Sequence, residues 1–124
     1  MDGEVSPAEL ERLLESDEPP VVVDIRTQMA FERGHIPGSR NIPFAVFPRE
    51  VEQLRGESHV VTVCPHGKAS VQAARLLTSF EGFDGRVESL ERGLSGWDGP
   101  LEREVEERDD SRAAERDDPP AAPF

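Results

Sequence analysis

Apolar residues follow two spacings along this chain. Near-continuous apolar runs predict strands buried on both faces of a sheet, at residues 21–25 and 60–64. Two weaker patterns predict a further strand and a brief one, at residues 87–90 and 41–43. Apolar residues at helical spacing predict helices, in residues 6–14, 27–33, 45–54 and 70–80. Because strands alternate with helices, we expect an α/β fold: a doubly wound, mostly parallel sheet of four to five strands with helices on both faces.

Capping and breaking residues refine these helices. Ser6 has a capping side chain and is followed three residues later by Glu9, so the first helix should begin directly after Ser6. Pro48 lacks a backbone N–H, and we expect it to kink the helix at 45–54 or to split it into two pieces. Trp97 closes a short helical segment and is expected to lie in the core.

The charge of the chain limits what it binds. Its 26 acidic and 14 basic residues leave a formal charge of −12, which argues against binding nucleic acid through the phosphate backbone. No apolar run is long enough to cross a bilayer, and residues 1–4 lack the parts of a signal peptide. We therefore expect a cytoplasmic protein that does not bind membranes. Lys68 is the single lysine, and an acidic, lysine-poor surface favours a halophilic source, with general solubility as the alternative.

The composition changes after Leu101. Residues 102–124 contain nine acidic residues and four arginines, with little apolar side chain to bury. We therefore expect one domain over residues 1–101, and an acidic tail over residues 102–124 that is either disordered or a frayed helix.

Cys64, the only cysteine, ends a predicted strand and precedes a tight loop and a helix. Loop N–H groups, the positive end of the helix dipole and the Lys68 ammonium would favour an anion there and lower the pKa of the thiol. The pattern thus predicts a nucleophile facing an anion-binding loop. The alternative is that Cys64 is a small buried core residue, and the local pattern leaves both open. The predicted substrate-binding residues are Pro65, His66, Gly67, Lys68, Ala69 and Ser70.

The chain resembles the rhodanese family in three segments that occur in the same order. Residues 64–70 and the following helix resemble its active-site loop, residues 24–26 and 31–43 resemble its upstream signature, and residues 93–97 resemble its closing segment. The resemblance implies a rhodanese-like fold and a sulfurtransferase in which Cys64 bears a persulfide. It implies no metal and no organic cofactor.

The same resemblance implies the substrates. Thiosulfate or a related sulfane donor would supply the sulfur, and cyanide, a thiol or a protein would accept it. A protein-to-protein persulfide carrier and a non-catalytic binding module are the alternatives, and the intact Cys64 argues against the second. Related phosphatases of this fold place an arginine six positions after the cysteine, where this chain has Ser70, so phosphate hydrolysis is disfavoured.

Two positions depart from the family pattern. Many members carry an arginine where this chain has Ala69, so Lys68 would have to supply the cationic contact alone. Pro65 has no N–H and leaves the loop one donor fewer. Weak thiosulfate turnover is therefore expected. His66 has two open interpretations, a contact to substrate or a side chain in water.

Three residues upstream are predicted to support the site. Asp24 and Arg26 flank the end of a strand and form either a support pair for the loops or an ordinary strand-end ion pair. His35 lies beside a turn, where a hydrogen-bonded structural role is favoured over a general base or a metal ligand. No second histidine or cysteine lies at metal-ligand spacing to His35, so no metal site is predicted.

Overall fold

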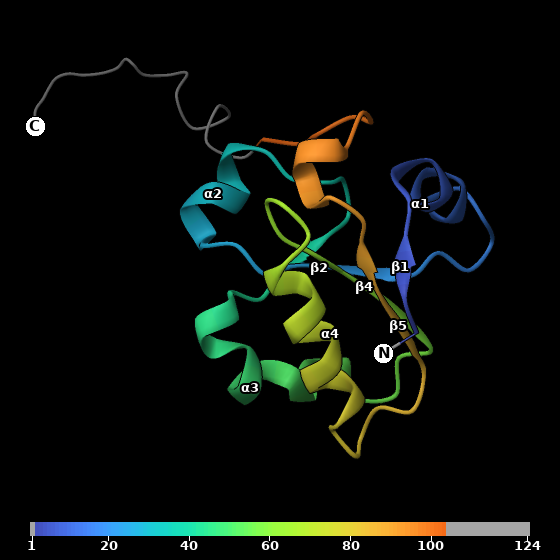
Figure 1. Cartoon of the computed structure of the whole chain (residues 1–124), viewed down its shortest axis with the longest axis vertical. Helices are drawn as coiled ribbons and strands as arrows, with labels where there is room; N and C mark the ends of the chain where they lie inside the picture. Colours follow the sequence, from blue (N-terminus) through green and yellow to red (C-terminus); the bar gives the residue numbers. More distant parts are fainter. Residues whose placement is uncertain (1, 104–124) are drawn as a thin grey trace, which may run out of the picture.

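The computed structural model describes residues 2–103 and contains a five-stranded, wholly parallel sheet (Figure 1). The strand order is β1-β5-β4-β2-β3, which places β4 in the centre. The strands are β1 (Glu4–Val5), β2 (Val21–Asp24), β3 (Arg40–Asn41), β4 (His59–Val63) and β5 (Arg86–Leu90). The predicted α/β class is confirmed. The edge strand β1 was not predicted, because two residues carry no periodicity.

The helices lie on both faces of this sheet. They are α1 (Pro7–Leu14), α2 (Gln28–Arg33), α3 (Phe47–Glu50) and α4 (Ala69–Thr78), with the 3-10 helices η1 (Phe44–Val46), η2 (Val51–Leu54) and η3 (Gly93–Gly96). Figure 1 shows α4 in front of the sheet, and α4 and η2 pack with α3 on one core. On the opposite face, α1 packs on a second core with Trp97 at its border. Trp97 is therefore only half-buried.

Successive strand residues contribute to opposite cores. Val23 and Val60 belong to the core under α4, whereas their chain neighbours Val22 and Val61 belong to the core under α1. Both faces of the strands are thus removed from water, which explains why the sequences of β2 and β4 are near-continuous apolar runs rather than alternating ones.

The start of α1 agrees with the sequence, but the third predicted helix does not. The Ser6 hydroxyl accepts a hydrogen bond from the Glu9 N–H at 3.1 Å and caps α1 as predicted. Residues 44–54, however, form one turn of α-helix between two 3-10 helices. Pro48 lies in the first turn of α3, where its missing N–H costs no helical hydrogen bond. The prediction of one kinked helix over 45–54 is therefore wrong, and the helical segment is split into three pieces rather than two.

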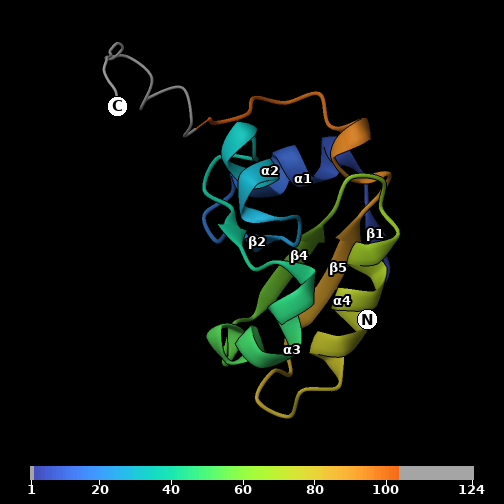
Figure 2. The ribbon, with the colours of Figure 1, turned by 90° about the vertical axis from the view of Figure 1, so that its left-hand side faces the viewer.

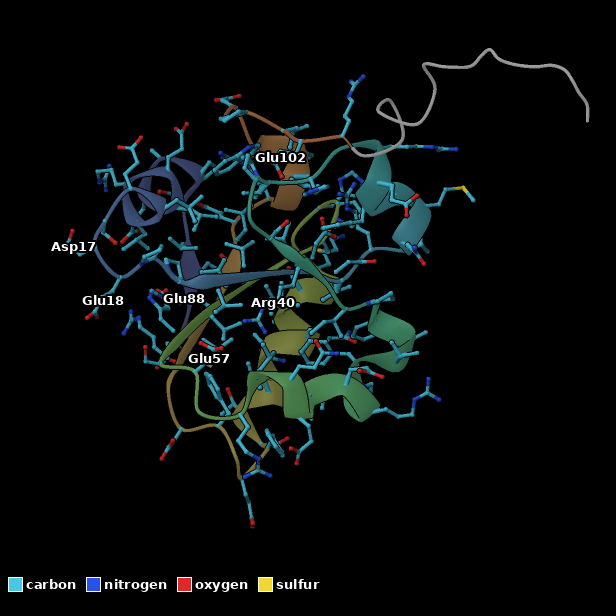
Figure 3. The ribbon with its side chains drawn as sticks, turned by 180° about the vertical axis from the view of Figure 1, so that it is seen from behind. Asp17, Glu18, Arg40, Glu57, Glu88 and Glu102 are labelled. Carbon is cyan, nitrogen blue, oxygen red and sulfur yellow. The ribbon has the colours of Figure 1, made fainter. Side chains whose placement is uncertain are left out.

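Charged residues on the α1 side connect the strands away from the carboxyl end of the sheet. Figure 3 shows Arg40, Glu57 and Glu88 from this side. The buried Glu88 binds His59 at 2.8 Å and Arg86 at 3.1 Å, and thereby ties β4 to β5. These contacts serve the fold. Among residues 2–103, no helix has the length and apolar content needed to cross a membrane.

The predicted boundary after Leu101 lies close to the last described residues. The backbones of His35 and Glu102 exchange two hydrogen bonds, of 2.9 and 2.7 Å, so Glu102 is an extended part of the fold. Figure 3 shows Glu102 on this side of the molecule. The rest of the predicted acidic tail, residues 104–124, lies outside the described residues.

Candidate active site

Cys64 directly follows β4, the central strand, at the carboxyl end of the sheet. The next four residues form a tight loop, and α4 begins at Ala69. Figures 1 and 2 both show this loop beside η3. Carboxyl ends of parallel strands are where open α/β sheets bind ligands. The predicted strand, loop and helix are therefore in place around the thiol.

The Cys64 sulfur lies within a ring of hydrogen-bond donors. The backbone N–H of Gly67 donates to Sγ at 3.1 Å, and that of Ser70 donates at 3.3 Å. The Ser70 hydroxyl lies 3.2 Å from Sγ. Gly67 adopts φ +85, a conformation that favours glycine, and this turn directs its N–H inward. The arrangement suits a sulfur anion.

These contacts determine the acidity of the thiol. Burial of Cys64 opposes ionisation, but the Ser70 hydroxyl and the backbone N–H groups of Ser70, His66 and Gly67 outweigh it and lower the pKa of the thiol. The sequence predicted this direction. Part of the lowered pKa was predicted to come from the Lys68 ammonium. In the structure, the groups that lower the pKa are the hydrogen-bond donors around the sulfur.

The depressed pKa gives a testable pH dependence. We expect iodoacetamide to alkylate Cys64 at lower pH in the folded chain than in the same chain unfolded in urea, where the thiol has an ordinary pKa of about 8.5. The folded state then binds fewer protons between the two pKa values. The thiolate thus stabilises the fold fully above the unfolded pKa, and that stability is lost as the pH falls through the folded pKa.

The measurement is the alkylation rate as a function of pH, followed by mass. Each curve is normalised to its own plateau, because Cys64 is 2% exposed in the fold and its absolute rate is limited by access. Equal midpoints for folded and unfolded chain would contradict the prediction.

A neighbouring segment that the sequence did not connect with the loop holds it in place. Leu94 N–H donates to the Cys64 carbonyl at 2.9 Å, and Ser95 N–H donates to the Pro65 carbonyl at 3.0 Å. Gly93, at φ +59, lies so close that an added Cβ would overlap the Cys64 carbonyl oxygen and approach Gly67 N to 2.7 Å. Only glycine permits this approach. The signal in the sequence was the glycine-rich closing segment.

The predicted loop residues divide into an inner and an outer set. Gly67 and Ser70 are buried against the sulfur, and Ala69 is half-buried in the first turn of α4. Pro65, His66 and Lys68 are exposed. The exposed set places one ammonium at the mouth of the loop. Their roles toward a substrate stay predictions.

The buried Asp24 and the partly buried Arg26 form an ion pair that connects the loops at this end of the sheet. The Arg26 guanidinium binds both carboxylate oxygens of Asp24, with a shortest distance of 2.7 Å, and also donates to the Gly34 carbonyl at 2.6 Å. The Asn41 amide donates to the carbonyls of Asp24 and Arg26. None of these contacts involves Cys64. The geometry thus favours a support pair, and Asn41 is a third member that the sequence did not indicate.

His35 has the contacts of a structural residue. Its ring stacks on Phe31 at 3.8 Å, its Nδ1 lies 2.7 Å from the Phe31 carbonyl, and its Nε2 lies 3.5 Å from Glu102. The ring is buried and connects α2 to the segment around Glu102. Within the described part of the chain, no group of three or more His, Cys, Asp or Glu side chains is arranged to hold a metal ion.

Comparisons with known proteins agree with this geometry. The sequence model of the rhodanese-like domain matches residues 6–99. Over 86 residues the chain is 31% identical to thiosulfate sulfurtransferase GlpE of Pseudoalteromonas translucida, covering 69% of this chain and 80% of that protein. A rhodanese-like domain protein of Staphylococcus aureus superposes with a TM-score of 0.72 at 28% identity, covering 83% of this chain and 98% of that one.

A further relative is longer than this chain. The protein named "Putative sulfur carrier protein YrkF" of Bacillus subtilis is 28% identical over 99 residues, which are 80% of this chain. The chain spans only about half, 52%, of the length of that protein. The similarity therefore concerns about half of that protein.

Proposed function

The chain belongs to the rhodanese family, and from this we propose that it is a sulfurtransferase that takes a sulfane sulfur from thiosulfate onto Cys64 and passes it to a nucleophilic acceptor. One observation carries the proposal: the only cysteine of the chain lies at the end of the central strand, where two backbone N–H groups donate to its sulfur and the Ser70 hydroxyl lies 3.2 Å from it. No metal or organic cofactor is needed for this chemistry.

The first half-reaction is a displacement at sulfur. The Cys64 thiolate attacks the outer sulfur of thiosulfate and forms a new S–S bond, while the original S–S bond of thiosulfate breaks. The electron pair of that bond leaves with sulfite. The enzyme then holds a persulfide whose outer sulfur carries the negative charge, and the total charge of the reactants equals that of the products.

The second half-reaction restores the thiolate. A nucleophile such as cyanide attacks the outer sulfur, the persulfide S–S bond breaks, and its electron pair returns to Sγ of Cys64. With cyanide the product is thiocyanate. In the cell we propose a thiol or a protein sulfur acceptor. The persulfide enzyme is the product of the first half-reaction and the reactant of the second, so ping-pong kinetics are expected.

The loop supplies the electrostatic stabilisation. The N–H groups of Gly67 and Ser70 already bind the sulfur and would stabilise negative charge on it through both half-reactions. The exposed Lys68 offsets, at the mouth of the loop, the repulsion of a dianion by a chain of formal charge −12. A site for phosphate is disfavoured, because Ser70 fills the sixth position after Cys64 and the next arginine, Arg75, is exposed on α4.

Intact mass tests the proposal directly. The protein is incubated with thiosulfate at high salt, which suits its acidic composition, and then with cyanide. We expect a gain of one sulfur, about 32 Da, located on Cys64 and removed by cyanide. No adduct on a folded protein whose thiol is reactive would refute thiosulfate as the donor. An unreactive thiol would refute the catalytic role of Cys64.

Two features favour a second candidate, a carrier of persulfide between proteins. The chain is similar to about half of the YrkF protein named above, and Ala69 and Pro65 remove a cation and a donor from the thiosulfate-binding side. A carrier would accept sulfur from a protein persulfide while it turns thiosulfate over slowly. Loading from a persulfidated protein in the absence of a thiosulfate adduct would favour this candidate.

Replacing Lys68 by alanine should raise the KM for thiosulfate about three- to tenfold, which corresponds to about 0.7 to 1.4 kcal/mol of binding. The kcat should change little, since an exposed ammonium contributes mainly to uniform binding of the dianion. Steady-state kinetics with thiosulfate and cyanide give both constants.

The matched control is Arg75→Ala, which removes one exposed positive charge from α4 outside the loop. Its KM should change by less than a factor of about two, because solvent and salt screen distant exposed charges. An equal rise of KM in both variants would show that Lys68 acts only through net charge.

A further inference from the structure

Two hydroxyl-bearing residues lie side by side in the sheet beneath the first turn of α4. Thr62 on β4 and Ser89 on β5 are direct partners in the parallel ladder. Thr62 lies two residues after Val60, and Ser89 lies two residues after Val87. Positions two apart share a face of a strand, and both valines belong to the core under α4, so both hydroxyl-bearing side chains face α4. Each of them reaches Ser70. The sequence offered only one signal, a polar residue within each of two buried strands.

The two contacts to Ser70 differ in kind. The Thr62 hydroxyl donates to the Ser70 backbone carbonyl at 2.7 Å and fixes the position of the helix turn. The Ser89 hydroxyl lies 2.7 Å from the Ser70 hydroxyl. Since the Ser70 hydroxyl lies 3.2 Å from the sulfur, Cys64, Ser70 and Ser89 form a continuous hydrogen-bonded chain.

This series of hydrogen bonds is shielded from water. Ser70 and Ser89 are both 0% exposed, and Cys64 is 2% exposed. A buried hydroxyl must place its proton on a nearby acceptor, because an unmade hydrogen bond in the interior is costly. The direction of each bond in the chain is therefore set by the protons available within it.

Counting these protons assigns the directions. A thiolate can only accept, so the Ser70 hydroxyl must donate its single proton to the sulfur. Ser70 Oγ then has only lone pairs left for Ser89, and the Ser89 hydroxyl must donate to it. In the neutral thiol the S–H can instead donate to Ser70 Oγ, and the hydrogen bond between Ser70 and Ser89 can then have either hydroxyl as its donor. The chain thus has one arrangement for the anion and more than one for the thiol.

We propose that Ser89 is a positioning residue for Cys64: its hydroxyl donates to Ser70 Oγ when the sulfur is negatively charged and so holds the Ser70 proton on the sulfur. A hydrogen bond that is itself polarised by a second donor is stronger, and most so toward an anion. The inference deepens the proposed function, because it concerns the ionisation of the same thiol on which that function rests.

The test is a double-mutant cycle on the pH profile of Cys64 alkylation by iodoacetamide. We expect Ser89→Ala to raise the midpoint by about 0.2 to 0.7 pH unit, the share of a charge-assisted hydrogen bond that cooperative polarisation supplies. In a Ser70→Ala background the same Ser89→Ala change should shift the midpoint by less than about 0.1 unit, since Ser89 acts only through Ser70.

Controls keep the result specific. Ser79→Ala removes an exposed hydroxyl that binds the Leu76 carbonyl, and it should leave the midpoint unchanged. Ser89→Gly is a second variant without the hydroxyl, with the same expected rise, in case the alanine variant does not fold. A wild-type midpoint in folded Ser89→Ala or Ser89→Gly would overturn the inference. A rise that persists without the Ser70 hydroxyl, or that also appears in Ser79→Ala, would overturn it as well.

The outcome is independent of the sulfur donor, because alkylation needs none. A Ser89 effect without any persulfide would leave the inference standing and refute the proposed function. If the persulfide forms normally but Ser89→Ala does not change the alkylation midpoint, the proposed function stands and this inference is refuted.

Discussion

Replacing Cys64 by serine is expected to abolish sulfur transfer while the protein stays folded. A serine hydroxyl cannot form a persulfide, so turnover with thiosulfate and cyanide should fall by at least about a thousandfold. The serine oxygen can still accept from the N–H groups of Gly67 and Ser70, which now bind the sulfur. The free energy of unfolding should therefore change by less than about 2 kcal/mol.

Cys64→Ala complements this variant, because it removes the acceptor as well as the nucleophile. Both variants should lack the mass gain after incubation with thiosulfate, since the chain has no other cysteine. The alanine variant should be the less stable one, with the loop donors left unpaired. Cys64→Ser retaining more than a small percentage of turnover would refute covalent transfer through this residue.

Gly93→Ala should cost both stability and activity. The added methyl group would overlap the Cys64 carbonyl oxygen and crowd Gly67 N and Pro65 C, and φ +59 is itself strained for alanine. Either the loop moves away or η3 does, and in both cases the hydrogen bond from Leu94 N–H to the Cys64 carbonyl is lost. We expect the free energy of unfolding to fall by at least about 2 to 4 kcal/mol. Sulfur transfer should fall in the remaining folded protein.

Gly38→Ala separates the clash from the strain. Gly38 also has a positive φ, of +82, but an added Cβ there would meet nothing within 4 Å. Its cost should be limited to the backbone conformation, about 1 to 2 kcal/mol. Urea unfolding of the two variants measures the difference. Equal losses in Gly93→Ala and Gly38→Ala would contradict the close approach of Gly93 to the active-site loop.

The central strands could be predicted from the sequence because their signal is local and unambiguous. An apolar run such as residues 60–64 is buried on both faces, so every position in it is constrained. The cap at Ser6 is equally local, since at the start of a helix the capping hydroxyl lies within reach of the backbone N–H three residues later.

Features that depend on distant residues could not be predicted. β1 has only two residues, and it becomes a strand because β5 offers it a free edge. Residues 44–54 carry helical spacing, yet Pro48 confines the α-helix to one turn. In both cases the conformation of a short segment is determined by its structural context rather than by its own apolar pattern.

The candidate site divides in the same way. Cys64, Gly67 and Ser70 belong to one contiguous loop, and the sequence indicated all three. Ser89 on β5 and Gly93 in η3 contact that segment from some twenty or more residues later in the chain, and no spacing rule connects them with it. A sequence therefore shows the groups that do the chemistry more readily than those that hold them.

The order of strands has a consequence for how the protein is made. Among residues 2–103, β1 precedes the other strands in the chain and pairs with β5 alone, and the segment that holds the Cys64 carbonyl follows β5. On the ribosome, Cys64 emerges well before Ser89 and Leu94 do. During that interval the nascent chain holds a cysteine without these contacts, and we expect β1 to pair with β5 late in folding, because long-range contacts carry a large entropic cost. The reactive thiol is thus assembled only when the domain is nearly complete.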